Sequence, residues 1–237
     1  MNLLLLLPSD FIDAETVELE GRRAEHMRTI LKTQIGDTVK VGLLNGNTGK
    51  ACVVKQEPNK IRLKVHPLTE LPPSLLPLKL ILGLPRPRVL HRLLQTVTAL
   101  GVAELHLLQT ARVEKSYWQT PLLAQTAVEE QLHLGLEQAK ATQPPKVFFH
   151  KRFIPFMEDE LSLLTKDRRK ILAHPSPNAR HIAANNADTV LAIGPEGGFI
   201  EKETQLFERF EFEALNFGAR ILKTETAVPY AIAKIFN

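Results

Sequence analysis

A glycine-rich loop of unusual composition follows an apolar run near the end of the chain. The run TVLAI has the composition of a buried strand, and residues 193–199 continue it as IGPEGGF. Glycines directly after a strand let a ligand or another backbone come close. Pro195 has no N–H to donate, and the Glu196 carboxylate would repel a phosphate group. The loop therefore favours a ligand without phosphate that is held by backbone groups.

Known phosphate-binding loops differ from this loop at identifiable positions. A nucleotide phosphate loop ends in Lys-Ser or Lys-Thr, and neither pair follows here. A dinucleotide loop has the spacing Gly-x-Gly-x-x-Gly, and Pro195 stands where its second glycine would be. An ordinary nucleotide-binding enzyme is therefore disfavoured, although it stays an alternative.

A second polar cluster, LNFGARILKTETA, precedes the last helix that the sequence predicts. Gly218 permits a tight turn, and Arg220 and Lys223 bring positive charge to it. Thr224 and Thr226 are alternative N-caps for the helix. A tight turn, a helix N-terminus and two cations together favour binding of a polar group. The alternative is that these residues only begin a helix.

The remaining candidates for chemistry are weaker. The eight histidines have no metal-ligand spacing and the chain has one cysteine, so we predict no metal site. Tyr117 and Trp118 beside Lys115 could stack on bases or could pack in a loop. Arg86 and Arg88 could contact backbone phosphate or could begin a solvated helix.

Composition places the chain among ordinary globular proteins of the cytoplasm. Its 237 residues carry a formal net charge of +4, which permits a nucleic-acid partner without requiring one. A single cysteine, Cys52, fits a reducing compartment. The leucine run at residues 3–7 has no preceding Lys or Arg and ends at Pro8, so we expect a strand and not a signal peptide. We predict no membrane segment and a cytoplasmic location.

Residues 1–70 are predicted to form a small β-barrel with one helix. The helical pattern from residue 21 places Ala24, Met27, Ile30 and Leu31 on one face. The turn NGNTG is typical of a hairpin. Short alternating strands flank this turn and the next one, which favours antiparallel pairing; they are residues 37–44, 50–56 and 61–65.

A proline-rich stretch at residues 71–77 is predicted to be an extended linker, and the pattern changes after it. From residue 78 to 237, apolar runs alternate with helical segments, which is typical of a mainly parallel α/β sheet. Ligands of such sheets bind beyond the carboxyl ends of the strands. Three strand ends carry the unusual residues, namely 172–178, 193–199 and 215–227.

The motifs IGPEGGF and LNFGARILKTETA, with AHPSPN before them, resemble the SPOUT class of RNA methyltransferases. The chain is most similar to the family that methylates N3 of a uridine in 16S ribosomal RNA of the small subunit. The resemblance covers almost the whole chain: RAEHMRTILKTQIGDTVKV is similar to the family's N-terminal PUA-like barrel, and LLQTVTALGVAELHLL and GLEQA are similar to later segments.

This resemblance implies a fold, a cofactor and partners. It implies a deep trefoil knot in an α/β SPOUT domain at residues 78–237 and an RNA-binding, PUA-like barrel at residues 1–70. It also implies a homodimer that binds S-adenosylmethionine and acts on ribosomal RNA or the small ribosomal subunit. The implied cofactor contacts are Leu172, Ala173, His174, Ile193, Gly194, Pro195, Glu196, Gly197, Gly198, Leu215, Gly218, Ile221, Leu222, Thr224 and Thr226.

Uridine methylation at N3 also implies roles for charged residues. The N3 proton must leave before N3 becomes a good nucleophile, so Glu225 or Glu196 could act as base. Arg112, Arg220 and Lys223 could stabilise the negative charge on the uracil. The residues expected to contact RNA are all cationic: Arg22, Arg23, Arg28, Arg86, Arg88 and Lys115.

Several positions depart from the family pattern. The chain has Thr96 and Ala99 where the family commonly has Lys and Glu, and Ala111 precedes Arg112 where the family has Glu. Ala139 stands after Glu-Gln of the long helix in place of an arginine, and Lys223 replaces an arginine. These departures motivate an alternative function, an RNA-binding ribosome-assembly factor that has the methyltransferase fold without catalysis.

Overall fold

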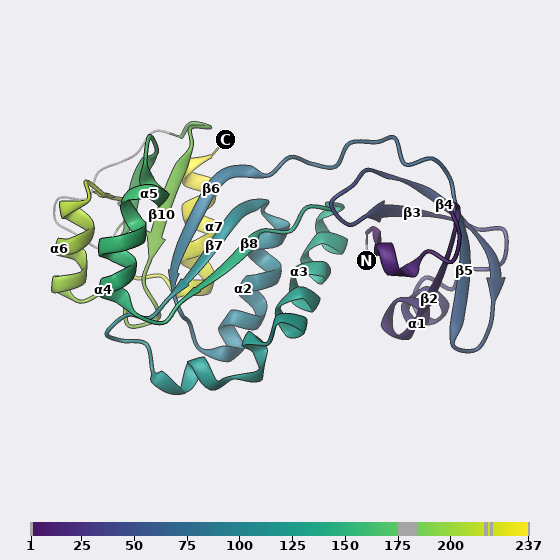
Figure 1. The fold of residues 1–237 in the computed structure, drawn as a ribbon, viewed down its shortest axis with the longest axis horizontal. Coiled ribbons are helices and arrows are strands. Elements are labelled where there is room, and N and C mark those ends of the chain that lie inside the picture. Colours follow the sequence, from purple (N-terminus) through teal and green to yellow (C-terminus); the bar gives the residue numbers. More distant parts are fainter. Residues whose placement is uncertain (1, 175–183, 216–217, 219, 237) are drawn as a thin grey trace. The chain divides into compact units, whose positions relative to one another are not determined.

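The computed structural model describes residues 2–174, 184–215, 218 and 220–236, and the chain divides into two compact units (Figure 1). The first unit comprises Met1–Ser74 and His133–Pro144, and the second comprises Leu75–Leu132 and Pro145–Asn237. Sequence patterns did not indicate that residues 133–144 pack with the first unit. Long-range hydrogen bonds hold this segment there: Thr142 Oγ1 donates to the Gly46 carbonyl at 2.6 Å, and the Asn2 N–H donates to the Glu137 carbonyl at 3.1 Å.

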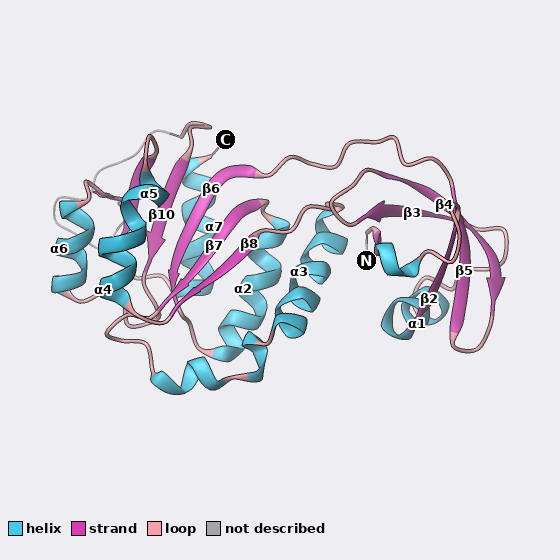
Figure 2. Cartoon of the chain, in the orientation of Figure 1, coloured by secondary structure: helices cyan, strands magenta, loops and turns pink. Residues whose placement is uncertain are grey.

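The first unit is built on a five-stranded sheet in the order β1-β3-β4-β5-β2 (Figure 2). β1 pairs with β3 in parallel, and the other pairs are antiparallel. The predicted hairpin between β3 and β4 is confirmed, and Asn45 in its turn has a φ of 60°. The elements of this unit are β1 (Leu4–Leu6), β2 (Thr16–Glu20), α1 (Gly21–Thr29), β3 (Thr38–Leu43), β4 (Thr48–Gln56) and β5 (Lys60–Val65).

Helix α1 is shorter than its apolar pattern predicted. Ala24 and Met27 are buried against the sheet, as expected, but Ile30 and Leu31 are 66% and 43% exposed. The prediction that these two share the buried face is wrong, because the helix ends at Thr29. The chain then turns away through Lys32, which has a φ of 52°.

The second unit contains a six-stranded sheet in the order β11-β9-β10-β6-β7-β8. All of its strand pairs are parallel, which confirms the predicted parallel α/β sheet. The strands are β6 (Leu76–Gly83), β7 (Val102–Leu108), β8 (Lys146–His150), β9 (Arg169–Ala173), β10 (Thr189–Ile193) and β11 (Glu213–Ala214).

Helices cover both faces of this sheet (Figure 1), which explains why its central strands are apolar throughout. Along β6, Leu80 and Leu82 pack in one core with the helices α2, α3 and α7, and Ile81 packs on the opposite face with α5 and α6. These helices are α2 (Pro87–Ala99), α3 (Gln125–Ala139), α4 (Phe153–Pro155), α5 (Leu161–Thr165), α6 (Glu201–Arg209) and α7 (Thr224–Ile235), and a π-helical turn, η4 (Phe156–Glu160), joins α4 to α5.

Three boundaries differ from the sequence predictions. Lys223 is the N-cap of α7 and makes no side-chain cap bond, so neither Thr224 nor Thr226 has the predicted capping role. The sequence pattern predicts a long helix over roughly residues 121–140, but α3 begins only at Gln125, after the 3-10 turns η2 (Lys115–Gln119) and η3 (Pro121–Leu123). β11 has only two residues, and residues 216, 217 and 219 lie outside the described part of the chain.

A row of polar side chains crosses one face of this sheet. Glu104 lies 3.1 Å from Lys79 Nζ and 3.3 Å from His106 Nε2. His106 Nδ1 lies 3.0 Å from His150 Nε2, and His150 Nδ1 lies 3.3 Å from Glu160. Burial lowers the pKa of His106 to about 4, although the hydrogen bond to Glu104 acts in the opposite direction. His106 is therefore held neutral in the folded protein.

This burial predicts a pH dependence of stability. Because the native pKa of His106 is below its unfolded value, the unfolded state binds more protons as the pH falls from about 6.5 to about 4, and stability is lost. We expect this group to cost about 2 kcal/mol of unfolding free energy between pH 7.5 and pH 5. Urea unfolding at both pH values measures this drop in unfolding free energy, and the drop should be smaller in His106→Gln than in the wild-type protein. The control His66→Gln replaces an exposed histidine, and its drop should equal that of the wild-type protein.

Candidate functional site

The three unusual strand ends meet at one edge of the parallel sheet. β10 pairs with β9 and β6, so the loop after Ile193 emerges between the ends of those two strands. The Leu215 N–H donates to the Leu172 carbonyl at 2.8 Å, which attaches the third segment to β9. Leu172, Ala173 and His174 are described, whereas residues 175–178 of the predicted AHPSPN motif lie outside the described residues.

The loop at residues 194–198 is packed closely against backbone, and its Glu196 and Gly197 are exposed. A Cβ atom on Gly83, at the end of β6, would lie 2.7 Å from the Pro195 nitrogen and closer still to its ring. A Cβ atom on Gly194 would lie 2.9 Å from the Gly198 backbone. Gly198 has a φ of 71° and donates its N–H to the Pro195 carbonyl at 2.7 Å. These glycines therefore set the path of the loop itself.

Glu196 links this loop to the start of α2. Its Oε1 accepts the Arg86 N–H at 3.0 Å, one residue before the first turn of that helix. Arg86 in turn faces Tyr117, whose hydrogen bond raises the pKa of the guanidinium. The Tyr117 hydroxyl donates to Glu114 at 2.8 Å. Glu196 thus has a positioning contact that the sequence left open.

Arg112 lies on the other side of the loop. Its Nη1 donates to the Gly197 carbonyl, and a Cβ atom on Gly197 would lie 3.0 Å from Arg112 Cδ. Burial lowers the pKa of His174, and the nearby Arg112 charge lowers it further. The structure thus brings Arg112 close to Gly197 after β10 and to His174 after β9, and its catalytic role stays a prediction.

Sequence analysis missed Glu203, which ties two loops of the site together. This side chain is buried, with 4% exposure, in the first turn of α6. Its carboxylate accepts the Ala111 N–H at 2.7 Å and the Ile200 N–H at 3.0 Å. Its position in the first helical turn after the glycine-rich loop is the sequence feature that could have indicated this role.

The segment before α7 presents its cations to solvent. Arg220 and Lys223 are exposed, and Ile221 is 93% exposed. Thr224 is buried, whereas Glu225 in the first turn is half-buried and Thr226 is exposed. The carboxylate of Glu225 and the two cations therefore lie on one short stretch of chain, next in sequence to a strand end of the site.

Comparison with known proteins identifies the family. Residues 72–236 match the RNA methyltransferase domain family. The chain belongs to this RNA methyltransferase family. It is 30% identical to the ribosomal RNA small subunit methyltransferase E of Treponema pallidum, over 99% of this chain and 90% of that protein. It is 29% identical to the ribosomal RNA small subunit methyltransferase E 1 of Borreliella burgdorferi, over 96% of this chain and 94% of that protein. The resemblance inferred from the motifs is confirmed.

Solved structures share the fold of this RNA methyltransferase. A Legionella pneumophila structure in complex with the cofactor SAM has a TM-score of 0.77 at 22% identity, and it covers 98% of this chain and 95% of that chain. The ribosomal RNA small subunit methyltransferase E of Neisseria gonorrhoeae, bound to S-adenosyl methionine, has a TM-score of 0.74 at 21% identity with the same coverage.

The cationic side chains predicted to bind RNA differ in their exposure and in the hydrogen bonds and ion pairs that they form within the protein. The Arg23 guanidinium donates to both oxygens of the buried Asp10, at 2.6 and 2.7 Å, and to the Leu5 carbonyl. These bonds use three of its five N–H groups, so Arg23 has a structural role, and its contact with RNA stays a prediction. Arg22 pairs with the buried Glu137 at 2.9 Å and is itself 42% exposed.

The other predicted RNA contacts are open to solvent. Arg28, Arg88 and Lys115 are exposed and form no ion pair within residues 2–174, 184–215, 218 and 220–236. Arg86, also exposed, is oriented by Tyr117. Phosphate contact stays possible for these four side chains of the methyltransferase.

Two features are absent from the described residues, a metal-binding cluster and a membrane-spanning helix. In the described part of the chain, no group of three or more His, Cys, Asp or Glu side chains could hold a metal ion. Across those same residues, no helix is long and apolar enough to cross a bilayer.

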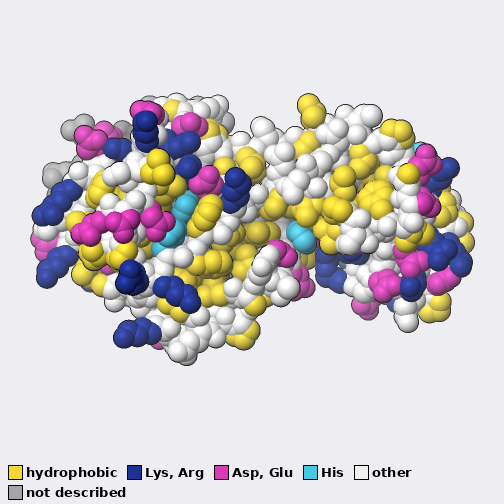
Figure 3. Space-filling model, in the orientation of Figure 1, with side chains coloured by type: hydrophobic (Ala, Val, Ile, Leu, Met, Phe, Trp, Pro, Cys, Tyr) yellow, Lys and Arg dark blue, Asp and Glu magenta, His cyan; other side chains and the backbone are white. Residues whose placement is uncertain are grey.

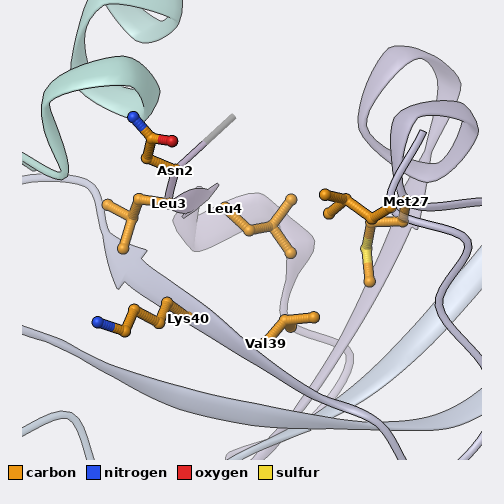
Figure 4. Close-up of a pocket in the computed structure, with 7 residues that line it drawn as sticks. Asn2, Leu3, Leu4, Met27, Val39 and Lys40 are labelled. Atoms are coloured by element: carbon orange, nitrogen blue, oxygen red, sulfur yellow. The ribbon is translucent and has the colours of Figure 1, made fainter.

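A pocket in the first unit of the methyltransferase is small and largely apolar (Figure 4). Its volume is about 180 Å³, and Leu4, Met27 and Val39 face one another in it, with Asn2 and Lys40 nearby. Lys40 is the one ionisable side chain in its lining, and no second polar group that could act with it lines the pocket apart from Asn2, so the pocket carries no functional assignment.

Proposed function

We propose that this chain transfers a methyl group from S-adenosylmethionine to N3 of a uridine in 16S ribosomal RNA. The supporting observation is its match, over nearly its whole length, to relatives named ribosomal RNA small subunit methyltransferase E. The described residues at the three strand ends support this cofactor. The backbone of residues 194–198 lies beside the apolar Leu172 and Ile193, and the exposed Glu196 carboxylate disfavours a phosphorylated ligand.

In this reaction the bound cofactor would supply a methyl group that is already activated as a sulfonium. The chain's own residues would hold the uridine and manage its N3 proton. Glu225, half-buried at the start of α7, is the proposed base. Arg112, held against the Gly197 carbonyl, would stabilise negative charge on the uracil oxygens together with Arg220 and Lys223.

Glu225→Gln is expected to lower the single-turnover rate of methyl transfer by about a hundredfold, because the amide cannot accept the proton. Cofactor affinity, measured by calorimetry, should change by less than about threefold, which is below 1 kcal/mol. The matched control is Glu201→Gln, an exposed carboxylate on α6. Full single-turnover activity of the Glu225 variant would remove it from the role of base.

The same proposal includes the finer architecture. We propose that residues 1–70 are a PUA-like RNA-binding barrel, residues 71–77 a linker whose last two residues begin β6, and residues 78–237 a SPOUT domain with a C-terminal trefoil knot. We further propose a cytoplasmic homodimer. The very high exposure of the apolar Ile221 beside the site supports a subunit contact there.

Mass spectrometry of ribosomal RNA from cells with and without the gene tests this function. Loss of one 3-methyluridine from the small-subunit RNA is the expected result. An unchanged RNA, together with calorimetric binding of S-adenosylmethionine, would instead favour the assembly factor without catalysis, for which the departures at Ala111 and Lys223 argue.

A further inference from the structure

A second pocket lies in the α/β unit, outside the candidate cofactor site. Its volume is about 320 Å³. The 3-10 turns η2 and η3 and the end of β8 contribute its walls. The lining residues are Trp118, Gln119, Thr120, Leu123, Ala124, Phe149 and Lys151. Two aromatic rings, one ammonium group and polar side chains therefore line one hollow.

Trp118 is held in place through its indole N–H, while its half-buried ring packs in part against the core of this unit. Its indole Nε1 donates to Gln109 Oε1 at 2.5 Å. The Gln109 amide donates to the Thr110 and Val113 carbonyls at 2.7 and 3.0 Å. The Gln109 N–H also donates to the His150 carbonyl at 2.8 Å. The ring orientation is thus set before any ligand binds, which lowers the entropic cost of stacking.

The pocket also carries features that an ordinary packing cluster lacks. Phe149 is 41% exposed although it lies on a strand, and the Lys151 ammonium lies 6.0 Å from the centre of the Trp118 ring. Lys115, Lys151 and Arg152 are exposed and make no ion pair with any described residue. Figure 3 shows Lys and Arg side chains around the lower left of this unit, where β7 and β8 end in Figure 1. An anionic ligand with an aromatic group fits this combination.

The same loop joins the pocket to the candidate cofactor site. Arg112 contacts Gly197, and the Ala111 N–H is bonded to Glu203, so the start of the loop lies against the glycine-rich segment. Trp118 follows six residues later, at most about 22 Å along an extended chain. An RNA whose target uridine lies beside the cofactor site is therefore long enough to continue into the pocket.

We propose that this pocket binds an unpaired base of the RNA substrate, next to the target nucleotide, stacked on Trp118 with its phosphates towards Lys151 and Lys115. Single-stranded nucleic acids bind proteins through such a combination of aromatic stacking and cationic grooves. The inference rests on the proposed function, because it takes RNA as the substrate. It assigns Trp118 as a substrate-positioning residue.

The test uses the fact that Trp118 is the only tryptophan of the chain. Titration of the full-length protein with a short single-stranded oligouridylate is expected to quench its fluorescence, and polyphosphate of equal charge is not. Trp118→Ala should weaken oligouridylate binding, measured by anisotropy, by about fivefold or more, and Trp118→Phe by less than about threefold. Lys151→Gln should weaken binding and reduce its salt dependence.

Three outcomes would overturn the inference: oligouridylate binding without quenching, equal quenching by polyphosphate, or unchanged affinity of a folded Trp118→Ala variant. If Trp118→Ala fails to fold, the fluorescence titration of the wild-type protein decides by itself. Methyl transfer to small-subunit RNA is assayed in parallel. If the protein methylates this RNA but Trp118 is neither quenched nor needed for binding, the base-binding role of the pocket is rejected and the proposed function is kept. If oligouridylate quenches Trp118 but no RNA is methylated, the base-binding role is kept and the proposed function is rejected.

Discussion

Gly83→Ala is expected to lower kcat/KM for methyl transfer by about a hundredfold, because a displacement of about 1 Å at a site can have that effect. The new methyl group would lie 2.7 Å from the Pro195 nitrogen, inside van der Waals contact. Neither β6 nor the proline ring can move aside without shifting the glycine-rich loop. Overpacking of this kind also costs about 1–3 kcal/mol of unfolding free energy.

Gly197→Ala provides the matched comparison for this prediction. It adds the same methyl group to the same loop, but the nearest atom is Arg112 Cδ at 3.0 Å, in a flexible and exposed side chain. We therefore expect Gly197→Ala to lose less cofactor affinity in calorimetry than Gly83→Ala does. Its unfolding free energy, measured in urea, should change little. If the two variants lose cofactor affinity equally, steric displacement by Pro195 is not the cause.

The general architecture could be predicted because it depends on local patterns. Strand β6 is covered on both faces, because Leu80 and Ile81 pack in different cores. Such a strand needs an unbroken apolar run, and that run is visible in the sequence. The hairpin turn at Asn45 has a sequence signature of its own. Helix ends were harder to predict, since the apolar periodicity of α1 continues through Ile30 and Leu31 after the helix has ended.

The contacts that shape the site could not be predicted, because they join distant parts of the chain. Glu196 and Arg86 are 110 residues apart, and Glu203 and Ala111 are 92 apart. No periodicity relates such pairs; the strand order of the sheet brings them together. Arg23 likewise pairs with Asp10, 13 residues away, and no sequence pattern indicated that contact.

Glu203→Ala is expected to lower the unfolding free energy by about 2–4 kcal/mol, because the partly buried hydrogen bonds from the Ala111 and Ile200 N–H groups would lose their charged acceptor. The segment that carries Arg112 would also lose its anchor to α6, so methyl transfer should fall with stability. Urea unfolding and single-turnover assays measure the two effects separately.

Two further variants separate the hydrogen bonds of Glu203 from the loss of its bulk. Glu203→Gln keeps the shape and one acceptor oxygen but presents an NH₂ group to the other N–H donor, so its loss of stability should be intermediate. Glu201→Ala removes an exposed carboxylate from the same helical turn and should change stability by less than about 0.5 kcal/mol. Equal losses for Glu203→Ala and Glu201→Ala would contradict the anchoring role. A graded series would instead establish that a buried carboxylate, remote in sequence from Arg112, holds the site together.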